Sequence, residues 1–356
     1  MSNIVTFLSY LGRKKASDVI ISSASVTYDV LTNFGSAVCG ISGGSDSDVM
    51  LDLVWNVNKY AKADVDYLWF DTGLEYQATK DHLSYLEDRY GISIIRERAI
   101  KSVPLCCKQY GIPFRSKLVS NRICALQKLG FDFSTPDVPG NKSTYAKNWW
   151  ENKYSNFDRN MLNISWNPYL KEFMMANPPT FQISQECCHY AKKAVAERYM
   201  KKSGKYLNII GVRKEEGGIR SKAQVSYING IGQMTCKTIQ ASYGSKFQPL
   251  FLYKNSDKEL YCKIQEIAHS RCYTEYGLLR TGCVGCPFSL YLKSKGIDVE
   301  AASKYEPGLY KAMMNVFGSS YEYTQQYYEF RSEYPKLQAL KYLIRHPLLK
   351  SKNATE

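Results

Sequence analysis

The chain has 356 residues, enough for one large α/β domain with appendages or for two ordinary domains, and it can bury a substantial core. The composition is 44% hydrophobic and 22% charged without a low-complexity tract, which excludes a largely disordered chain. Lys and Arg (47) outnumber Asp and Glu (33), and the net charge of +14 favours a polyanionic partner, although many nucleotide enzymes are basic without binding polymers.

No basic segment leads into an apolar stretch with a small-residue cleavage site, and no apolar run reaches the roughly 18 residues of a membrane span. We therefore expect a cytoplasmic protein that does not bind membranes. Eleven cysteines in that compartment should be mostly reduced, so clustered cysteines are more typical of metal or redox ligands than of disulfides.

Residues 1–35 show two stretches of helix-like apolar spacing, which predict a helical cap packed on the main domain. The pattern changes at residue 36. A short apolar run at 37–41 leads through a Gly/Ser-rich turn into an amphipathic stretch at 46–60. This is the order strand, phosphate-type loop, helix.

Further strands alternate with helices along the chain. Apolar runs at 65–70 and 92–95 predict strands, and the stretch between them, 76–90, predicts a helix. This spacing predicts parallel βαβ units, and hence an α/β fold with a doubly wound, mostly parallel sheet. Right-handed crossovers then place the loops after Ile41 and Phe70 at one carboxyl edge, where open α/β sheets bind ligands.

Residues 131–180 are rich in proline, asparagine and aromatic residues, and we interpret them as an insertion or lid. Regular patterns return with a helix at 188–201 and a strand at 206–212, followed by an arginine-rich loop. The predicted organisation is a helical cap at 1–35, a main domain at 36–300 that carries the insertion, and a C-terminal helical extension at 301–356.

The segment Ser42-Gly43-Gly44-Ser45-Asp46-Ser47 has the chemistry of an anion cradle. Glycines let the backbone approach phosphate oxygens, the following helix points its N–H groups and positive dipole end at the charge, and serines add hydroxyl donors. The Lys of a Walker A loop is missing, which disfavours kinase-like transfer. The alternative is a Gly/Ser turn in which Asp46 caps a helix.

Two other segments add charged groups near strand ends. Asp71-Thr72-Gly73 follows the second strand, and the segment Gly211-Val212-Arg213-Lys214-Glu215-Glu216 spans the end of the strand at 206–212 and the loop after it. Arg213 and Arg220 suit a phosphate or sulfate because a guanidinium binds such an anion through two hydrogen bonds. The alternative is that both arginines are solvated surface residues.

Together these segments resemble the phosphoadenylyl-sulfate reductase family of PP-loop enzymes, as does Gln248-Pro249-Leu250. The resemblance covers roughly residues 20–290. It implies an adenine nucleotide at the carboxyl edge of the sheet, with the phosphates on the PP-loop and the ribose or base near Asp71. The implied cofactor-binding residues are Ser42, Gly43, Gly44, Ser45, Asp46, Ser47, Asp71, Thr72, Gly73, Gly211 and Arg213, and the implied catalytic residues are Asp46, Ser47, Arg213 and Arg220.

Cysteines form a second pattern, Cys187-Cys188 and Cys283-Val284-Gly285-Cys286-Pro287. A C-x-x-C turn brings two sulfurs to one centre, and thiolates without histidine suit iron–sulfur or zinc. The pattern resembles the ligation of the adenylyl-sulfate reductases, which implies a [4Fe–4S] cluster on Cys187, Cys188, Cys283 and Cys286. The alternative is a set of buried thiols beside an unmetallated turn. Cys236 and Cys272 are reserve ligands.

The remaining cysteines are expected to be structural. Cys106-Cys107 and Cys124 form another group near Arg115 and Arg122, which is more typical of a helix face than of a site. Cys39 lies in the first predicted strand and is expected to be a core residue.

One departure from the family points to the mechanism. Sulfonucleotide reductases attack sulfur with a cysteine in a C-terminal tail, yet no cysteine follows Cys286. The chain is thus similar to the branch of DNA phosphorothioation and tRNA thiolation enzymes, which implies ATP pyrophosphatase chemistry. We expect ATP-dependent, Fe–S-dependent sulfur transfer to a nucleic acid or nucleotide, through an adenylated intermediate. Mg²⁺ would neutralise the departing pyrophosphate, with help from Asp46 and Asp71 unless these only cap helices.

The expected partners are an adenine nucleotide, DNA or tRNA, and a sulfur donor such as a cysteine desulfurase. The first alternative is a sulfonucleotide reductase that binds PAPS or APS, uses an unconventional thiol and thioredoxin, and releases sulfite. The second is a non-catalytic nucleotide-binding subunit of a nucleic-acid complex. The aromatic insertion is available to stack bases in the leading hypothesis, although such enrichment is more often core.

Overall fold

A computed structural model describes residues 4–138, 140, 144–154, 160–216, 226–227, 233–235, 245–289 and 297–345. The chain divides into two compact units. Unit 1 comprises Met1–Val103, Cys188–Val284 and Gly296–Tyr310, and unit 2 comprises Pro104–Cys187, Gly285–Lys295 and Lys311–Glu356. Within the described residues, no helix is both long and apolar enough to span a membrane.

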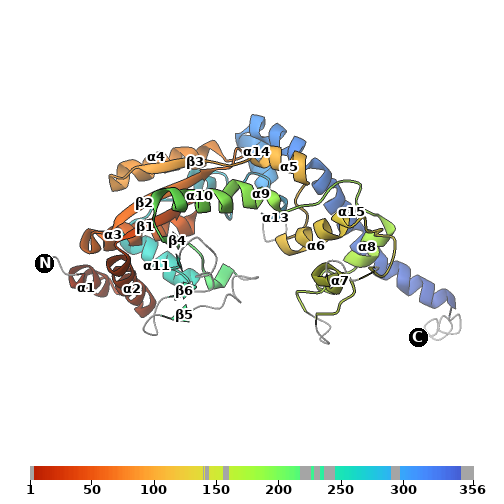
Figure 1. The fold of residues 1–356 in the computed structure, drawn as a ribbon, viewed down its shortest axis with the longest axis horizontal. Helices are drawn as coiled ribbons and strands as arrows, with labels where there is room; N and C mark the ends of the chain where they lie inside the picture. Colours follow the sequence, from red (N-terminus) through yellow and green to blue (C-terminus); the bar gives the residue numbers. More distant parts are fainter. Residues whose placement is uncertain are drawn as a thin grey trace, which may run out of the picture. The chain divides into compact units, whose positions relative to one another are not determined.

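Unit 1 contains a seven-stranded sheet in the order β3-β2-β1-β4-β7-β6-β5 (Figure 1). The strands are β1 (Ser36–Ile41), β2 (Asp64–Asp71), β3 (Ile94–Arg98), β4 (Leu207–Ile210), β5 (Ser226–Tyr227), β6 (Gln233–Thr235) and β7 (Ser245–Phe247). From β3 to β7 neighbouring strands pair in parallel, whereas β6 pairs antiparallel with β7 and β5. The predicted α/β class with a mostly parallel sheet is confirmed.

Helices of unit 1 cover both faces of this sheet. They are α1 (Val5–Arg13), α2 (Asp18–Phe34), α3 (Ser45–Ala61), α4 (Gln77–Tyr90), α10 (Ala194–Ser203), α11 (Asn255–Gln265), α12 (Arg271–Thr274) and α14 (Ile297–Tyr305). Ala37, Cys39 and Ile41 of β1 join the core cluster that α2, α3, α4 and α11 complete, whereas Val38 packs with Met200 of α10 on the other side. This alternation along β1 makes the sheet doubly wound.

The N-terminal helices belong to this core. Helices α1 and α2, dark red in Figure 1, contact each other, and α2 packs against α3. Ser17 caps α2 by accepting a hydrogen bond from the N–H of Ile20, and Gly35 ends it with a left-handed φ of 66°. The chain then enters β1 directly at Ser36.

The order of the strands indicates which edge of the sheet is suited to bind a ligand. The chain moves outward from β1 to β2 and β3, and it returns on the other side of β1 with β4 and β7. Strands β1 and β4 pair in register through Gly40 and Ile210. The sheet therefore reverses its winding between β1 and β4, and the loops after Ile41 and Ile210 flank the place where open α/β sheets bind ligands.

Unit 2 is helical. Its elements include α6 (Lys117–Lys128), α7 (Thr144–Trp150), η1 (Ile164–Trp166), α8 (Leu170–Ala176), α13 (Pro287–Ser289) and most of α5 (Val103–Tyr110), α9 (Glu186–Cys188) and the long α15 (Pro307–Arg345). Trp149, Trp150, Phe173 and Tyr327 are among the fully buried side chains of its core. The predicted insertion at 131–180 and most of the predicted C-terminal extension thus belong to one compact unit, with much of their aromatic content in its core.

Candidate nucleotide site

The loop between β1 and α3 has the backbone of an anion cradle. Gly43 adopts a left-handed φ of 66°, which favours glycine. The N–H of Ser42 donates to Oγ of Ser47 at 2.9 Å, and the N–H of Gly44 donates to Oγ of Ser42 at 3.3 Å. Gly44 is the N-cap of α3 and provides no side-chain cap. Asp46 thus lies in the first turn of α3, and the alternative in which it caps the helix is wrong.

Close approach of neighbouring segments explains the glycines at this edge. A Cβ on Gly43 would lie 2.8 Å from Cγ2 of Thr79, and one on Gly44 would lie 2.8 Å from Oγ1 of Thr281. A Cβ on Gly211, after β4, would lie 3.2 Å from the carbonyl oxygen of Asp46. Gly211 therefore lets the end of β4 pack against the start of α3.

Two cations hold the carboxylate of Asp46. Its Oδ1 lies 3.0 Å from Nε of Arg213 and 2.9 Å from Nζ of Lys258. Arg213 is almost fully buried, and it also donates to Oδ1 of Asn255 at 3.0 Å. Arg213 was expected to be an anion ligand; here its guanidinium is paired with a carboxylate of the protein. The paired Asp46 is a poor magnesium ligand because two cations already occupy it.

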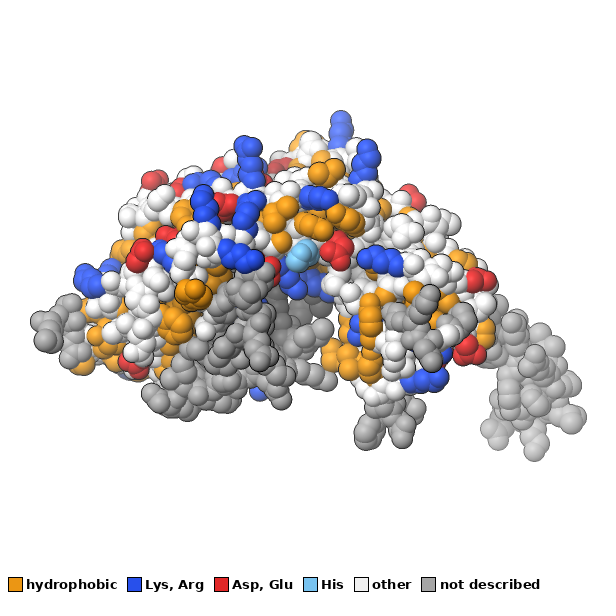
Figure 2. Space-filling view, in the orientation of Figure 1, with side chains coloured by type: hydrophobic (Ala, Val, Ile, Leu, Met, Phe, Trp, Pro, Cys, Tyr) orange, Lys and Arg blue, Asp and Glu red, His pale blue; other side chains and the backbone are white. Residues whose placement is uncertain are grey.

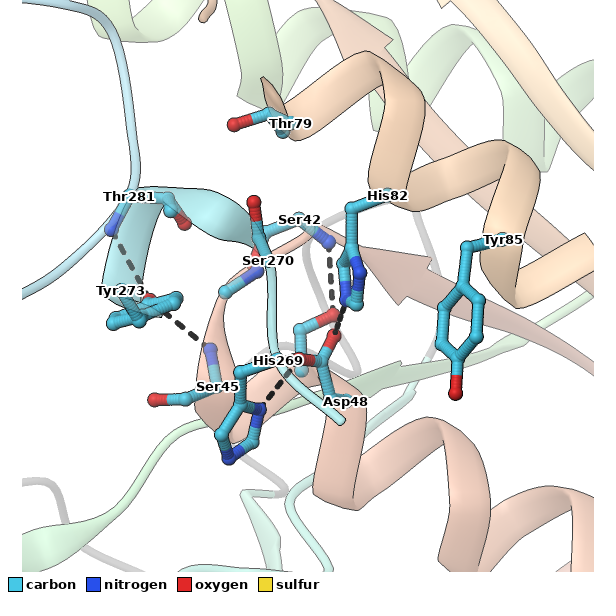
Figure 3. Close-up of polar contacts among 12 residues, drawn as sticks. Ser42, Ser45, Asp48, Thr79, His82, Tyr85, His269, Ser270, Tyr273 and Thr281 are labelled. Atoms are coloured by element: carbon cyan, nitrogen blue, oxygen red, sulfur yellow. Dashed lines mark hydrogen bonds and ion pairs between the residues drawn. The ribbon is translucent and has the colours of Figure 1, made fainter. Parts of the chain in front are cut away.

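Two side chains on the PP-loop had no signal in the sequence. Lys258 of α11 donates to Oγ of Ser45 at 2.7 Å, in addition to its ion pair with Asp46. The hydroxyl of Tyr273 on α12 accepts hydrogen bonds from the N–H of Ser45 at 3.0 Å and the N–H of Thr281 at 3.2 Å (Figure 3). Neither residue belongs to a motif, and only the fold brings both to the start of α3.

Asp48, one turn into α3, is a fully buried carboxylate between two histidines (Figure 3). Its Oδ1 lies 3.1 Å from Nε2 of His82, and its Oδ2 lies 2.8 Å from Nδ1 of His269. The hydrogen bond from Asp48, with a weaker one from Cys262, raises the pKa of His269 to about 9. His269 is therefore protonated at neutral pH, and the charge pair ties α3 to the segment after α11.

Sequence reasoning missed this group, although a signal existed. The chain has only four histidines, and two of them contact Asp48. A second acidic residue in the first turn of α3, two positions after Asp46, was also visible in the sequence.

The Asp71-Thr72-Gly73 loop follows β2. Oδ1 of Asp71 accepts the N–H of Gly73 at 3.0 Å, and Gly73 has a φ of 80°. Thr72 is fully buried, and its hydroxyl donates to the carboxylate of Glu75. Burial raises the pKa of the Glu75 carboxyl, and the hydrogen bond from Thr72 opposes that shift. Asp71 and Gly73 shape the loop, whereas Thr72 anchors it.

This loop also contacts the C-x-x-C segment. Oγ1 of Thr72 lies 3.4 Å from Sγ of Cys283, and the N–H of Val284 donates to the carbonyl of Leu74 at 2.8 Å. Burial raises the pKa of the Cys283 thiol, Lys192 opposes the shift, and Glu75 and Cys188 add to it. The nucleotide edge of unit 1 and one of the predicted cluster ligands therefore share residues 72–74.

The four predicted cluster ligands divide between the units. Cys188 and Cys283 belong to unit 1, and Cys187 and Cys286 belong to unit 2. No disulfide links the described cysteines, and no three or more Cys, His, Asp or Glu side chains group as a metal site among the described residues. All four are thiols, the donor type that an iron–sulfur cluster requires.

Other cysteines that the sequence singled out are buried. Cys272 is buried on α12, with its sulfur 3.5 Å from Oγ1 of Thr79. Cys106 and Cys107 are buried on α5, and Cys39 is buried in the core on β1, where burial raises its pKa. The predicted residues Arg220 and Cys236 lie outside the described residues.

Comparison with known proteins finds a family match in residues 36–130. Residues 36–130 match the family model of the phosphoadenosine phosphosulfate reductase domain. This match confirms the resemblance. The matched segment runs from β1 through α6 and so contains the PP-loop, Asp48 and the Asp71-Thr72-Gly73 loop.

A curated relative, an uncharacterized protein from Methanocaldococcus jannaschii, is 40% identical over 88 residues. The alignment covers 25% of this chain, and the chain spans only 18% of that relative.

Two solved structures are more distant. The phosphate complex of phosphoadenylyl-sulfate (PAPS) reductase from Candida auris is 15% identical, with a TM-score of 0.35 over 69% of this chain and 80% of that one. The U34-tRNA thiolase NcsA from Methanococcus maripaludis, with its [4Fe-4S] cluster, is 16% identical, with a TM-score of 0.38 over 91% and 80%.

Proposed function

We propose that the chain is an enzyme that uses ATP for sulfur transfer to a nucleic acid or nucleotide. The observation that carries the proposal is the loop at residues 71–75, which shapes the nucleotide edge through Asp71 and holds Cys283 through Thr72. A nucleotide-activating site and a sulfur-handling thiol are thus joined by one short segment. The family match supports the nucleotide half of this proposal.

In the proposed reaction, an oxygen of the acceptor attacks the α-phosphorus of ATP. The bond between the α-phosphorus and the bridging oxygen breaks, and pyrophosphate leaves. Sulfur from a donor, such as the persulfide of a cysteine desulfurase, then attacks the adenylated carbon or phosphorus and displaces AMP. The transferred sulfur then joins donor and acceptor through an S–S bond, and a dithiol reductant supplies the two electrons that cleave this bond, which releases the thiolated acceptor and the thiol of the donor.

Residues of the PP-loop would bind the departing pyrophosphate. The N–H groups at the start of α3, including that of Ser45 once it is released from the Tyr273 hydroxyl, would donate to the anion at the positive end of the helix dipole. Lys258, held 2.7 Å from Oγ of Ser45, adds a positive charge beside them. Mg²⁺ would enter on the nucleotide phosphates and neutralise the charge that develops on pyrophosphate. Asp71 is the remaining protein candidate for contact with this ion.

Cys187, Cys188, Cys283 and Cys286 would hold a [4Fe–4S] cluster with one thiolate on each iron, and the cluster would supply electron-transfer chemistry for the sulfur-transfer step. The proposal rests on the spacing of the cysteines and on their thiol chemistry. Thr72 would orient Cys283 through its hydroxyl, and Lys192 would offset thiolate charge.

The deciding experiment is anaerobic purification with quantification of iron and acid-labile sulfide, combined with pyrophosphate release from ATP with and without tRNA or DNA. About four irons per chain and nucleic-acid-stimulated pyrophosphate release are expected. Lys258→Met should suppress the release, whereas Lys263→Met, at an exposed position of the same helix, should not. Absence of pyrophosphate release from the iron-loaded protein would contradict the proposal.

The second candidate is a sulfonucleotide reductase, which the family match specifically favours. It predicts sulfite release from PAPS or APS with thioredoxin. One cysteine outside the cluster set would then be essential, so single Cys→Ser variants assayed for sulfite separate the two functions. Nucleotide binding without either reaction would indicate a non-catalytic subunit.

A further inference from the structure

The positive charge of the chain is concentrated in unit 2. Unit 2 contains 19 Lys and Arg against 10 Asp and Glu, a formal charge of +9 out of the total of +14, although it is the smaller unit. On the face shown in Figure 2, basic side chains occur next to exposed hydrophobic ones. An excess of cations together with exposed hydrophobic groups is typical of surfaces that bind unpaired nucleic acid.

One surface of unit 2 combines these features, and we name it the Arg115 patch. It consists of Arg115, Trp166, Tyr169, Tyr328 and Arg331. Trp166 is 53% exposed, Tyr328 39% and Tyr169 37%. Most other aromatic side chains of unit 2 lie in its core, whereas each of these three rings exposes more than a third of its surface.

Arg115 connects the parts of the patch. Its Nη1 donates to the hydroxyl of Tyr328 at 3.1 Å, and its Nη2 donates to Oδ1 of Asn167 at 3.1 Å. Its guanidinium carbon lies 5.0 Å from the ring centroid of Tyr327 and 5.7 Å from that of Tyr328. Arg115 thus links α15 to the loop that begins directly after Trp166.

This loop is held in place. The hydroxyl of Tyr327 donates to the carbonyl of Pro168 at 2.8 Å, and the ring of Tyr169 lies 5.2 Å from that of Tyr334. Arg115 and Tyr169 both adopt left-handed backbones, with φ of 59° and 58°. Such conformations are uncommon in non-glycine residues and persist where surrounding contacts impose them. The exposed rings are therefore presented from an ordered frame, which lowers the entropy lost on stacking.

Charge around the patch is suited to phosphate. Burial raises the pKa of the Tyr327 phenol, and the charges of Arg115 and Arg331 both oppose that shift, so both cations lie near this ring. Glu172 acts in the other direction on the same ring, and Glu329 lies on α15 beside Tyr328. Arg115 thus lies beside the exposed ring of Tyr328 and Arg331 lies near Tyr327 on the same helix, so two cations are available for phosphates where bases would stack.

We propose that the Arg115 patch binds a single-stranded or unpaired segment of nucleic acid. Bases would stack on Trp166, Tyr169 and Tyr328, and phosphates would contact Arg115 and Arg331. The choice of nucleic acid as the partner rests on the proposed function, which this surface extends by naming where the acceptor docks.

The test is fluorescence anisotropy of a labelled single-stranded 20-mer titrated with the full chain, in the absence of ATP and at several salt concentrations. Trp166→Ala and Tyr328→Ala should each weaken binding by about tenfold. Arg331→Ala should reduce the slope of log K against log salt by about 0.7, the value for one phosphate of a single strand. Tyr328→Phe keeps the ring and should retain most of the affinity.

Tyr206→Ala is the matched control because Tyr206 is a 70% exposed tyrosine of unit 1. The proposal would be refuted if this control lost as much affinity as the patch variants, or if the patch variants bound the single strand as tightly as wild type. A duplex of the same sequence that binds as tightly as the single strand would also refute it. The binding assay contains no ATP and is therefore independent of the pyrophosphate-release assay. A protein that binds the single strand tightly but releases no pyrophosphate in the separate assay would contradict only the proposed function.

Discussion

Tyr273→Phe should tighten nucleotide binding. The Tyr273 hydroxyl accepts the N–H of Ser45, one of the amides at the start of α3 that a phosphate needs. A nucleotide must therefore break this hydrogen bond, whose net contribution is about 1 kcal/mol. Removal of the hydroxyl removes that cost, so the Kd for ATP should fall by about fivefold.

Isothermal titration with ATP or pyrophosphate would measure this effect. Tyr276→Phe is the matched control because its hydroxyl contacts Glu306 and not the PP-loop. A weaker affinity in Tyr273→Phe would refute the reasoning, since it would mean that the hydroxyl donates to the bound phosphate. An unchanged Kd would mean that phosphate binds without using the N–H of Ser45.

Three further predictions concern the residues that frame the site. Because Asp48 raises the pKa of His269 from 6.5 to about 9, the stabilisation is complete below about pH 6.5 and is lost as pH rises through 9. Urea unfolding should show the free energy of unfolding falling by about 1 to 2 kcal/mol over this range, less than the full shift would give because solvent screens the partly exposed imidazole. His269→Gln should flatten the profile, and a slope that persists in this variant would assign the pH dependence to another group. Asp46→Asn removes one of the two carboxylates that pair with the buried Arg213, since Glu215 remains 3.4 Å from its Nη1, and should lower the free energy of unfolding by about 1 to 2 kcal/mol, so a thermal midpoint within a degree of wild type would contradict the pairing. Gly43→Ala places a Cβ 2.8 Å from Thr79 at positive φ and should destabilise by about 1 to 2 kcal/mol, whereas the control Gly282→Ala, where a Cβ meets nothing within 4 Å, should be neutral.

Local pattern was enough to predict the nucleotide edge of unit 1. Three patterns follow one another directly in the sequence: the apolar run of β1, the glycines after it and the apolar spacing of α3. A strand, a glycine-rich loop and a helix in this order commonly form a phosphate-binding loop at the edge of a sheet. The family resemblance placed Gly211 among the nucleotide-site residues, and in the structure it packs beside the start of α3.

Contacts made across long sequence separations were not predictable. Lys258 of α11, His269 of the segment between α11 and α12, and Tyr273 of α12 all reach the start of α3, and nothing near them in sequence marks the contact. The role of Arg213 was only half visible, because the sequence shows a cation but does not show that Asp46 neutralises it. The two compact units were also hidden, since each is assembled from three separate stretches of chain.

Residues 71–75 serve two neighbouring segments at once, and this offers a way to sort relatives by sequence. Asp71 and Gly73 shape the turn after β2, whereas Thr72 and Leu74 hold the Cys283 segment. In relatives that lack these cysteines, we expect substitutions at the positions of Thr72 and Glu75, because no cysteine segment remains to be held there. Asp71 and Gly73 should still be conserved. Conservation of Asp71, Thr72, Gly73 and Glu75 together with Cys283 would instead identify relatives in which the nucleotide edge and the cysteine segment are conserved together.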